Sequence, residues 1–298
     1  MRIFRFLGIT LTTISIAFAQ APPSTDIWLA PLTVSDAGVR LGAPVNITHR
    51  AGYDNQPSFL PDGSGVLYTS LQTEPPGPQA PTQTDIYLYN IVGTVSLRLT
   101  RTPESEYSAT VMPSGVAFSV VRVEPDSTQR LWQFDLNGQQ TAVILRDVKP
   151  VGYHAWVNNN TVALFVLGSP PTLQLAKISI GKSDTLAAGI GRSIHKIPGK
   201  QAISFVHKIS QTEWWIKEFD VATRNITPIV QTIAGREDYA WTPDGTLVMA
   251  NESKFYTFKP DRGTQWSEVA DFSGQGIKGI TRIAISSKGD RLAFVAAE

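Results

Sequence analysis

The sequence predicts an all-β protein whose six similar units close into a ring, a six-bladed β-propeller. Three observations support this prediction. A strand, tight turn and strand recur six times at nearly even spacing, helical periodicity is weak throughout, and the chain begins and ends with complementary halves of one unit. Radial closure of such units leaves only short, protected sheet edges.

The clearest copy of the repeat is SFLPDGSGVLYTS, Ser58 to Ser70. Pro61 fixes φ for the first corner of the turn, and Asp62 can bond to its own backbone. Gly63 accepts the positive φ with which the chain reverses. Apolar residues on both sides of this turn make the stretch a predicted β-hairpin.

The tip of this hairpin can be followed along the whole chain. The intervals between successive tips are 52, 45, 40, 45 and 44 residues by subtraction of their first residue numbers, close to the 40–45 typical of four-stranded blades. A Pro-rich insertion around residues 74–84 lengthens the first interval. The six tips are Pro61-Asp62-Gly63, Pro113-Ser114-Gly115, Asn158-Asn159-Asn160, Pro198-Gly199-Lys200, Pro243-Asp244-Gly245 and Ser287-Lys288-Gly289.

The two ends of the chain predict how the ring closes. Asp26 to Leu29 and Pro44 to Thr48 match the third and fourth strands of a blade. Ile280 to Ile285 and Arg291 to Val295 match the first and second strands. We therefore expect the N-terminal strands to pair with the C-terminal hairpin and complete the sixth blade, so that residues 20–298 form a single domain.

The first nineteen residues have the order of a secretory signal peptide. Arg2 and Arg5 precede an apolar run from Phe6 to Phe18, and Ala17-Phe18-Ala19 supplies a small-residue cleavage site. The apolar run is shorter than the ~20 residues that span a bilayer. We expect cleavage after Ala19 and export to the periplasm or the extracellular space, with no membrane span in the mature protein.

Composition excludes several classes of function. Lys plus Arg exceed Asp plus Glu by one residue, so no excess of positive charge indicates a nucleic-acid partner. The chain has no cysteine, which excludes disulfides, thiolate metal sites and a cysteine nucleophile. With 42% apolar residues, the chain can instead bury a large core.

The repeat resembles that of TolB-like six-bladed β-propellers. SFLPDGSGVLYTS, followed by DIYLYNI and LRLT, is a close match, and AWTPDGTLV at residues 240–248 is a good one, whereas the third and fourth repeats lack the PDG turn. TolB itself carries an α/β domain ahead of its propeller, so the resemblance is to the propeller part. It implies an exported, non-enzymatic scaffold, a monomer that binds a protein or peptide partner in the cell envelope.

Aligning the first strands on their turns gives a register. Residues three before the turn are mostly small and those two before it mostly large, so we expect the small face to line the channel and the large face to pack between blades. His195 and Lys196 break this pattern, by a slip of register or because the fourth blade is special. The residues five before the turn are polar or amphipathic: Gln56, Ser108, Tyr153, Ser193, Asp238 and Arg282.

Acidic and aromatic residues mark the loops that enter the first strands. In propellers of this kind these loops surround one mouth of the channel, where exposed tyrosines favour protein contacts. Alternatively, such residues are ordinary in turns and at strand edges and have only a structural role. The predicted partner-binding rim consists of Tyr53, Asp54, Glu106, Tyr107, Tyr153, His154, His195, Asp238 and Tyr239.

No catalytic motif accompanies the repeat: neither G-x-S-x-G nor H-E-x-x-H occurs. We therefore expect no enzymatic activity and no cofactor. One alternative is a metal-assisted hydrolase or lyase acting on a lactone or saccharide, with a divalent cation in the channel. Its ligands would come from Asp54, Glu106, His154 and Asp238. Another is an accessory subunit of a larger envelope assembly.

Overall fold

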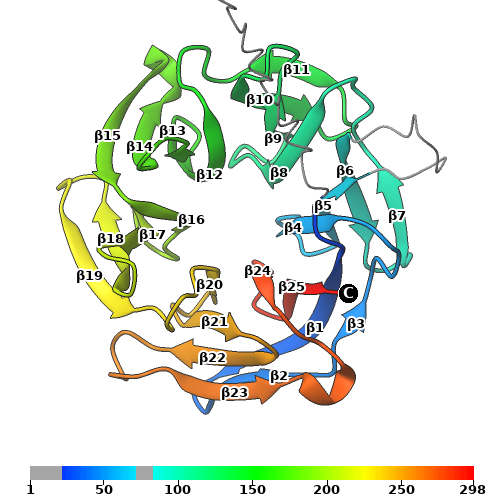
Figure 1. Ribbon diagram of the computed structural model, residues 1–298, viewed down its shortest axis with the longest axis vertical. Coiled ribbons are helices and arrows are strands. Elements are labelled where there is room, and N and C mark those ends of the chain that lie inside the picture. Colours follow the sequence, from blue (N-terminus) through cyan, green and yellow to red (C-terminus); the bar gives the residue numbers. More distant parts are fainter. Residues whose placement is uncertain (1–21, 72–82) are drawn as a thin grey trace, which may run out of the picture.

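The computed structural model describes residues 22–71 and 83–298. The expected signal peptide and most of the Pro-rich insertion lie outside these residues. Six antiparallel sheets stand around a central axis, which confirms the predicted six-bladed propeller (Figure 1). Within the described part, no helix has the length and apolar character that crossing a bilayer requires.

Five blades consist of four consecutive strands each, running from the axis outward. The first three blades are β4 (Asp54–Phe59), β5 (Gly65–Leu71), β6 (Thr84–Asn90) and β7 (Val95–Arg98); β8 (Ser105–Val111), β9 (Ala117–Val123), β10 (Gln129–Asp135) and β11 (Gln140–Val143); and β12 (Val151–Asn158), β13 (Thr161–Val166), β14 (Thr172–Lys177) and β15 (Lys182–Ala188). The fourth and fifth are β16 (Ile190–Lys196), β17 (Ala202–Lys208), β18 (Trp214–Asp220) and β19 (Ile226–Gln231); and β20 (Tyr239–Trp241), β21 (Leu247–Asn251), β22 (Lys254–Phe258) and β23 (Ser267–Asp271). Short 3₁₀ turns occupy Ile178–Ile180 and Ser273–Gln275.

The sixth blade joins the two ends of the chain. Its strands are β24 (Thr281–Ile285), β25 (Arg291–Ala297), β1 (Thr25–Ser35), β2 (Gly38–Leu41) and β3 (Val45–Asn46). Strand β1 pairs with β25 over seven positions, from Thr25 opposite Ala297 to Pro31 opposite Arg291. The predicted closure of the ring by its two ends is therefore confirmed.

The N-terminal half of this blade is longer than the sequence prediction of a short third strand at Asp26 to Leu29. Strand β1 continues to Ser35 and turns back into β2, which pairs with its distal half. On the side of β1 away from β25, the proximal half pairs with β3, which lies within the predicted Pro44 to Thr48 run, at Trp28 and Leu29. Two short strands thus share the outer position of the blade.

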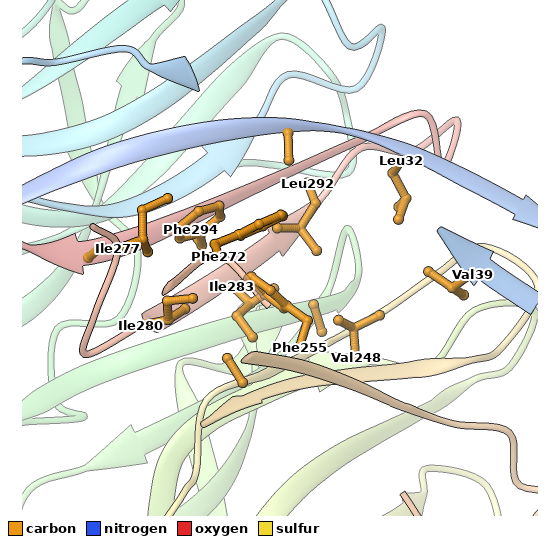
Figure 2. Packing of buried hydrophobic residues seen from close by; sticks show 14 residues of the cluster. Leu32, Val39, Val248, Phe255, Phe272, Ile277, Ile280, Ile283, Leu292 and Phe294 are labelled. Carbon is orange, nitrogen blue, oxygen red and sulfur yellow. The ribbon is translucent and has the colours of Figure 1, made fainter. Parts of the chain in front are cut away.

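The hydrophobic core is divided into six clusters, one at each interface between neighbouring blades. The interface between the fifth and sixth blades holds fourteen buried residues (Figure 2). There Phe294 of β25 packs edge-on against Phe255 of β22, with ring centroids 5.2 Å apart. The closing blade is thus held by packing as well as by strand pairing.

The predicted division between a channel face and an interblade face is incomplete. In the third blade Trp156 packs against the second blade, while its small neighbour Ala155 packs against the fourth. Both rows of residues also border the channel. The reason is geometric. Both faces of each inner strand pack against neighbouring blades, and the unpaired edge of the strand lines the axis, so residues of both rows reach the channel.

The register of the fourth blade does not slip. Lys196 pairs with Ile203 as Phe59 pairs with Val66 in the first blade. The fourth blade therefore differs in its side chains: His195 and Lys196 stand at positions that are otherwise mostly small and mostly large and apolar.

Candidate functional site

A cavity of about 760 Å³ occupies the central channel and is bordered by all six inner strands. At one end lie residues near the beginnings of these strands, such as Tyr153 and Arg282. At the other end lie the hairpin tips, including Pro61, Pro113 and Ser287, which are exposed. The channel is therefore open on the side of the hairpin tips.

β-Bulges orient side chains at the end of the channel where the inner strands begin. The pairing of the inner strand with its neighbour shifts between Asn55 and Ser58, and the same irregularity recurs in other blades. Gln56, Ser108 and Arg282 adopt φ values of 57°, 54° and 50° at these bulges. Such left-handed backbone is unusual for residues other than glycine, so the sheets hold these side chains in place at a local cost in strain.

Arg282 reaches across the channel from the sixth blade to the third, on the opposite side of the ring. Its Nη2 donates a hydrogen bond of 2.7 Å to the hydroxyl of Tyr153, and its guanidinium carbon lies 4.8 Å from the centre of the Tyr153 ring. The Tyr153 ring in turn packs edge-on against Phe165. This contact bridges the channel at the end where the inner strands begin.

Asp238 lies beside this bridge and pairs chiefly with Arg192. The Nε and Nη2 of Arg192 donate to the two carboxylate oxygens of Asp238 over 3.1 and 2.5 Å. Burial raises the pKa of Asp238, but the charges of Arg282 and Arg192 outweigh burial and hold the pKa below its ordinary value. Glu237 also pairs with Arg192, at 3.2 Å. Asp238 is therefore an ionised, fixed part of the network.

Two further tyrosines complete this end of the channel. Tyr53 directly precedes β4 and Tyr107 lies in β8 just before its bulge, so both stand where their inner strands begin. Burial raises the pKa of Tyr53 to about 12. All three tyrosines and both arginines keep some exposed surface. We call the group the mouth cluster: Tyr53, Tyr107, Tyr153, Arg192 and Arg282.

Two acidic residues of the predicted rim are fully buried. Asp54 forms an ion pair of 2.6 Å with Arg50. Glu106 accepts a hydrogen bond from Thr102, and its other carboxylate oxygen has no partner among the described residues. Burial is the largest cause that raises the pKa of Glu106 to about 7. Each carboxylate therefore joins the start of an inner strand to the loop that precedes it, through Arg50 and Thr102, and lies beneath the surface.

His154 and Tyr239 are also interior residues that take part in a repeated interblade contact. His154 Nε2 and Trp156 Nε1 lie 2.7 and 2.9 Å from the hydroxyl of Ser119 on the preceding blade. In the fifth blade, Tyr239 and Trp241 each donate to the hydroxyl of Ser204 over 2.8 Å. Trp156 and Trp241 both stand two before the turn, and their contacts agree with the prediction that the large residues of this row pack between blades.

His195 borders the channel in the fourth blade. Its ring lies edge-on to that of Tyr239, with centroids 4.7 Å apart. Burial is the main cause that lowers the pKa of His195 to about 4, and it does the same for His154. Both imidazoles are therefore neutral near pH 7.

The structure does not bring the four predicted metal ligands together. His154 faces Ser119, Asp54 is paired with Arg50, and Asp238 is paired with Arg192. Across residues 22–71 and 83–298, no group of three or more His, Asp or Glu side chains has an arrangement that could hold a metal ion.

The predicted rim omitted both arginines of the mouth cluster. Arg282 stands five before the turn, which by the period of two of a strand is the same face as the small positions that were expected to line the channel. Arg192 stands six before the turn, and the irregular pairing between Ile190 and Ile194 brings it to the channel. No sequence signal shows that irregularity.

Comparison with solved structures supports the fold. A TolB candidate from Agrobacterium tumefaciens superposes with a TM-score of 0.70 at 13% identity, covering 93% of this chain and 99% of that one. TolB from Acinetobacter baumannii gives 0.57 at 13% identity, covering 91% of this chain and 64% of that one. The chain has the structure of a TolB-like six-bladed β-propeller, at low sequence identity.

Enzymes share this fold. An oligogalacturonate lyase in complex with manganese superposes with a TM-score of 0.57 at 14% identity, covering 85% of this chain and 79% of that one. No protein-family model matches the sequence, and no curated protein matches it. At such identities, the likeness establishes the fold and leaves the function open.

Proposed function

We propose that the protein is an exported, monomeric, non-enzymatic binding protein that captures a protein or peptide partner of the cell envelope at the mouth cluster. The observation that carries this proposal is the placement of three tyrosines and two arginines at one end of the ring, where five of the six inner strands begin. Tyrosine and arginine are enriched among the residues that dominate binding energy at protein interfaces.

The scaffold favours such a role because it fixes these side chains before binding. Tyr153 is held by Arg282 and Phe165, and Arg192 is held by two carboxylates. Side chains that are already ordered lose less conformational entropy on association than free ones. Export rests on the N-terminal signal pattern, and the partner class on the resemblance to TolB-like propellers.

Affinity capture from the native cell envelope tests this function. We expect the mature protein to retain a specific partner, and the double substitution Tyr53→Ala with Tyr107→Ala to reduce retention at least tenfold. Tyr256→Ala is a matched control, because Tyr256 is a partly exposed tyrosine on β22, away from the channel. Equal capture by all three proteins would reject the mouth cluster as the binding surface.

A further inference from the structure

Within the described residues, the one ion pair of Arg282 is long and shared with Arg192. The nearest carboxylate in the described structure belongs to Asp238, whose Oδ1 lies 3.8 Å from Nη1 of Arg282, and that carboxylate is already engaged by Arg192. The Arg282 side chain is only 17% exposed, so water compensates its charge poorly. A guanidinium with a phenol as its closest polar partner can still accept an anion in a charge-assisted, bidentate contact.

The charges at the channel wall leave a small positive excess. Arg192 is offset by Asp238 and Glu237, so the excess comes from Arg282 and Lys196, while the two histidines that border the channel are neutral near pH 7. Lys196 is exposed near the hairpin tips, and none of the ion pairs of the described residues includes it. An excess of one charge in a concave site attracts ligands of the opposite sign.

Between its charged groups the channel is apolar. Five of the six large positions two before the turn are Phe59, Val111, Trp156, Trp241 and Ile285, and all five border the cavity. Lys196 takes the sixth position. The cavity volume of about 760 Å³ lies within the range of pockets that bind small organic molecules.

We propose that the channel binds an apolar chain that ends in a carboxylate. The chain enters from the hairpin tips, lies against the apolar positions, and places its carboxylate at Arg282 beside the hydroxyl of Tyr153. Both a free alkanoic acid and the C-terminus of an apolar peptide have this chemistry. The inference goes beyond capture of a partner at the mouth cluster, because this ligand enters by the opposite opening and meets the cluster only at Arg282 and Tyr153, from inside the channel.

Calorimetric titration of the purified protein at pH 7 tests this proposal with matched pairs of ligands. One pair is decanoate and 1-decanol, and the other is acetyl-Leu-Val-Phe with a free and with an amidated C-terminus. We expect a carboxylate to bind at least tenfold more tightly than its neutral counterpart. Binding of decanoate alone identifies a small acid, binding of the free peptide alone identifies a chain end, and no preference for either carboxylate overturns the proposal.

Substitutions locate the carboxylate. Arg282→Met should weaken binding of the preferred carboxylate about tenfold or more, Arg282→Lys should weaken it less, and Lys196→Glu should weaken it by adding a negative charge at the opening. Arg224→Met is the matched control: Arg224 also has a left-handed backbone, with φ 61°, but forms an exposed pair with Asp184 outside the channel.

Circular dichroism checks that each variant is folded. Wild-type affinity in folded Arg282→Met would contradict the proposal. These titrations use no protein partner, so their failure leaves capture at the mouth cluster intact, and failure of that capture leaves these titrations intact.

Discussion

Arg282 and Tyr153 are 129 residues apart in sequence and belong to opposite blades, yet they share a hydrogen bond of 2.7 Å across the channel. Among the described residues, no other side-chain hydrogen bond or ion pair joins these two blades directly. The bond is therefore a direct brace across the propeller as well as part of its mouth cluster.

Tyr153→Phe removes this brace and keeps the packing of the ring on Phe165. We expect the free energy of unfolding in urea to fall by about 1 kcal/mol, the typical net value of one hydrogen bond. Tyr256→Phe serves as a control on a tyrosine away from the channel. An unchanged free energy for Tyr153→Phe would show that the brace adds no stability.

Ser119 and Ser204 occupy equivalent places in the second and fourth blades, and each hydroxyl meets two polar side chains of the next blade. Ser119→Ala leaves the buried Nε1 of Trp156 without its partner, and Ser204→Ala does the same for the hydroxyl of Tyr239. Each substitution should reduce the free energy of unfolding by about 2 kcal/mol.

Ser179→Ala, at an exposed position, should change that free energy by less than about 0.5 kcal/mol. Chemical denaturation of the three variants checks these values. Losses for Ser119→Ala and Ser204→Ala no larger than that of the control would mean that these contacts do not join the blades.

Phe294 belongs to the cluster that closes the ring. Its ring is fully buried and contacts Phe255, so Phe294→Ala should cost about 3–5 kcal/mol in unfolding free energy. Leu136→Ala removes an apolar side chain that is 47% exposed and should cost far less. A similar, small loss in both variants, measured by thermal or urea unfolding, would contradict the role of this cluster in closure.

Glu106 makes stability depend on pH. In the unfolded chain its carboxyl has the ordinary pKa of 4.5. In the folded state, chiefly because the carboxyl is buried, its pKa is raised to about 7. Folding therefore takes up a proton between these values, and the contribution of Glu106 to stability falls as the pH rises from about 4.5 to 7.

Glu106→Gln removes this dependence. The difference in unfolding free energy between the variant and the wild type should therefore grow in favour of the variant by up to about 3 kcal/mol as the pH rises from 4.5 to 8. Glu252→Gln, which removes one partner of an exposed ion pair, is the matched control. Urea unfolding at pH 5, 6.5 and 8 distinguishes the two, and a flat difference for Glu106→Gln would refute the shifted pKa.

The ring and its closure were predictable because they depend on local signals. Pro61-Asp62-Gly63 and its equivalents mark hairpin tips by their own turn chemistry, and Gly63 and Gly245 do adopt the expected positive φ, at 75° and 80°. The β1–β2 hairpin also had a signal that the prediction left unused, since Leu32 and Val34 alternate with polar residues before the turn at Asp36 to Gly38.

The site was less predictable because its contacts join distant blades. Arg192 binds Asp238, which is 46 positions away in sequence. Arg192 reaches the channel because the pairing of its strand is irregular, and no residue pattern predicts that irregularity. Burial of Tyr239 and Glu106 similarly depends on how neighbouring blades cover the strand ends. Residue type alone does not distinguish these from the partly exposed Tyr53 and Tyr107.

Site-specific photo-crosslinking in the native envelope tests most directly whether the mouth cluster is the binding surface. Benzoylphenylalanine in place of Tyr53 or Tyr107 should yield a covalent adduct with one partner protein. The same residue in place of Ile180, which is exposed at the outer edge near the opposite end, should yield none. Adducts at position 180 but not at positions 53 and 107 would contradict the proposed function.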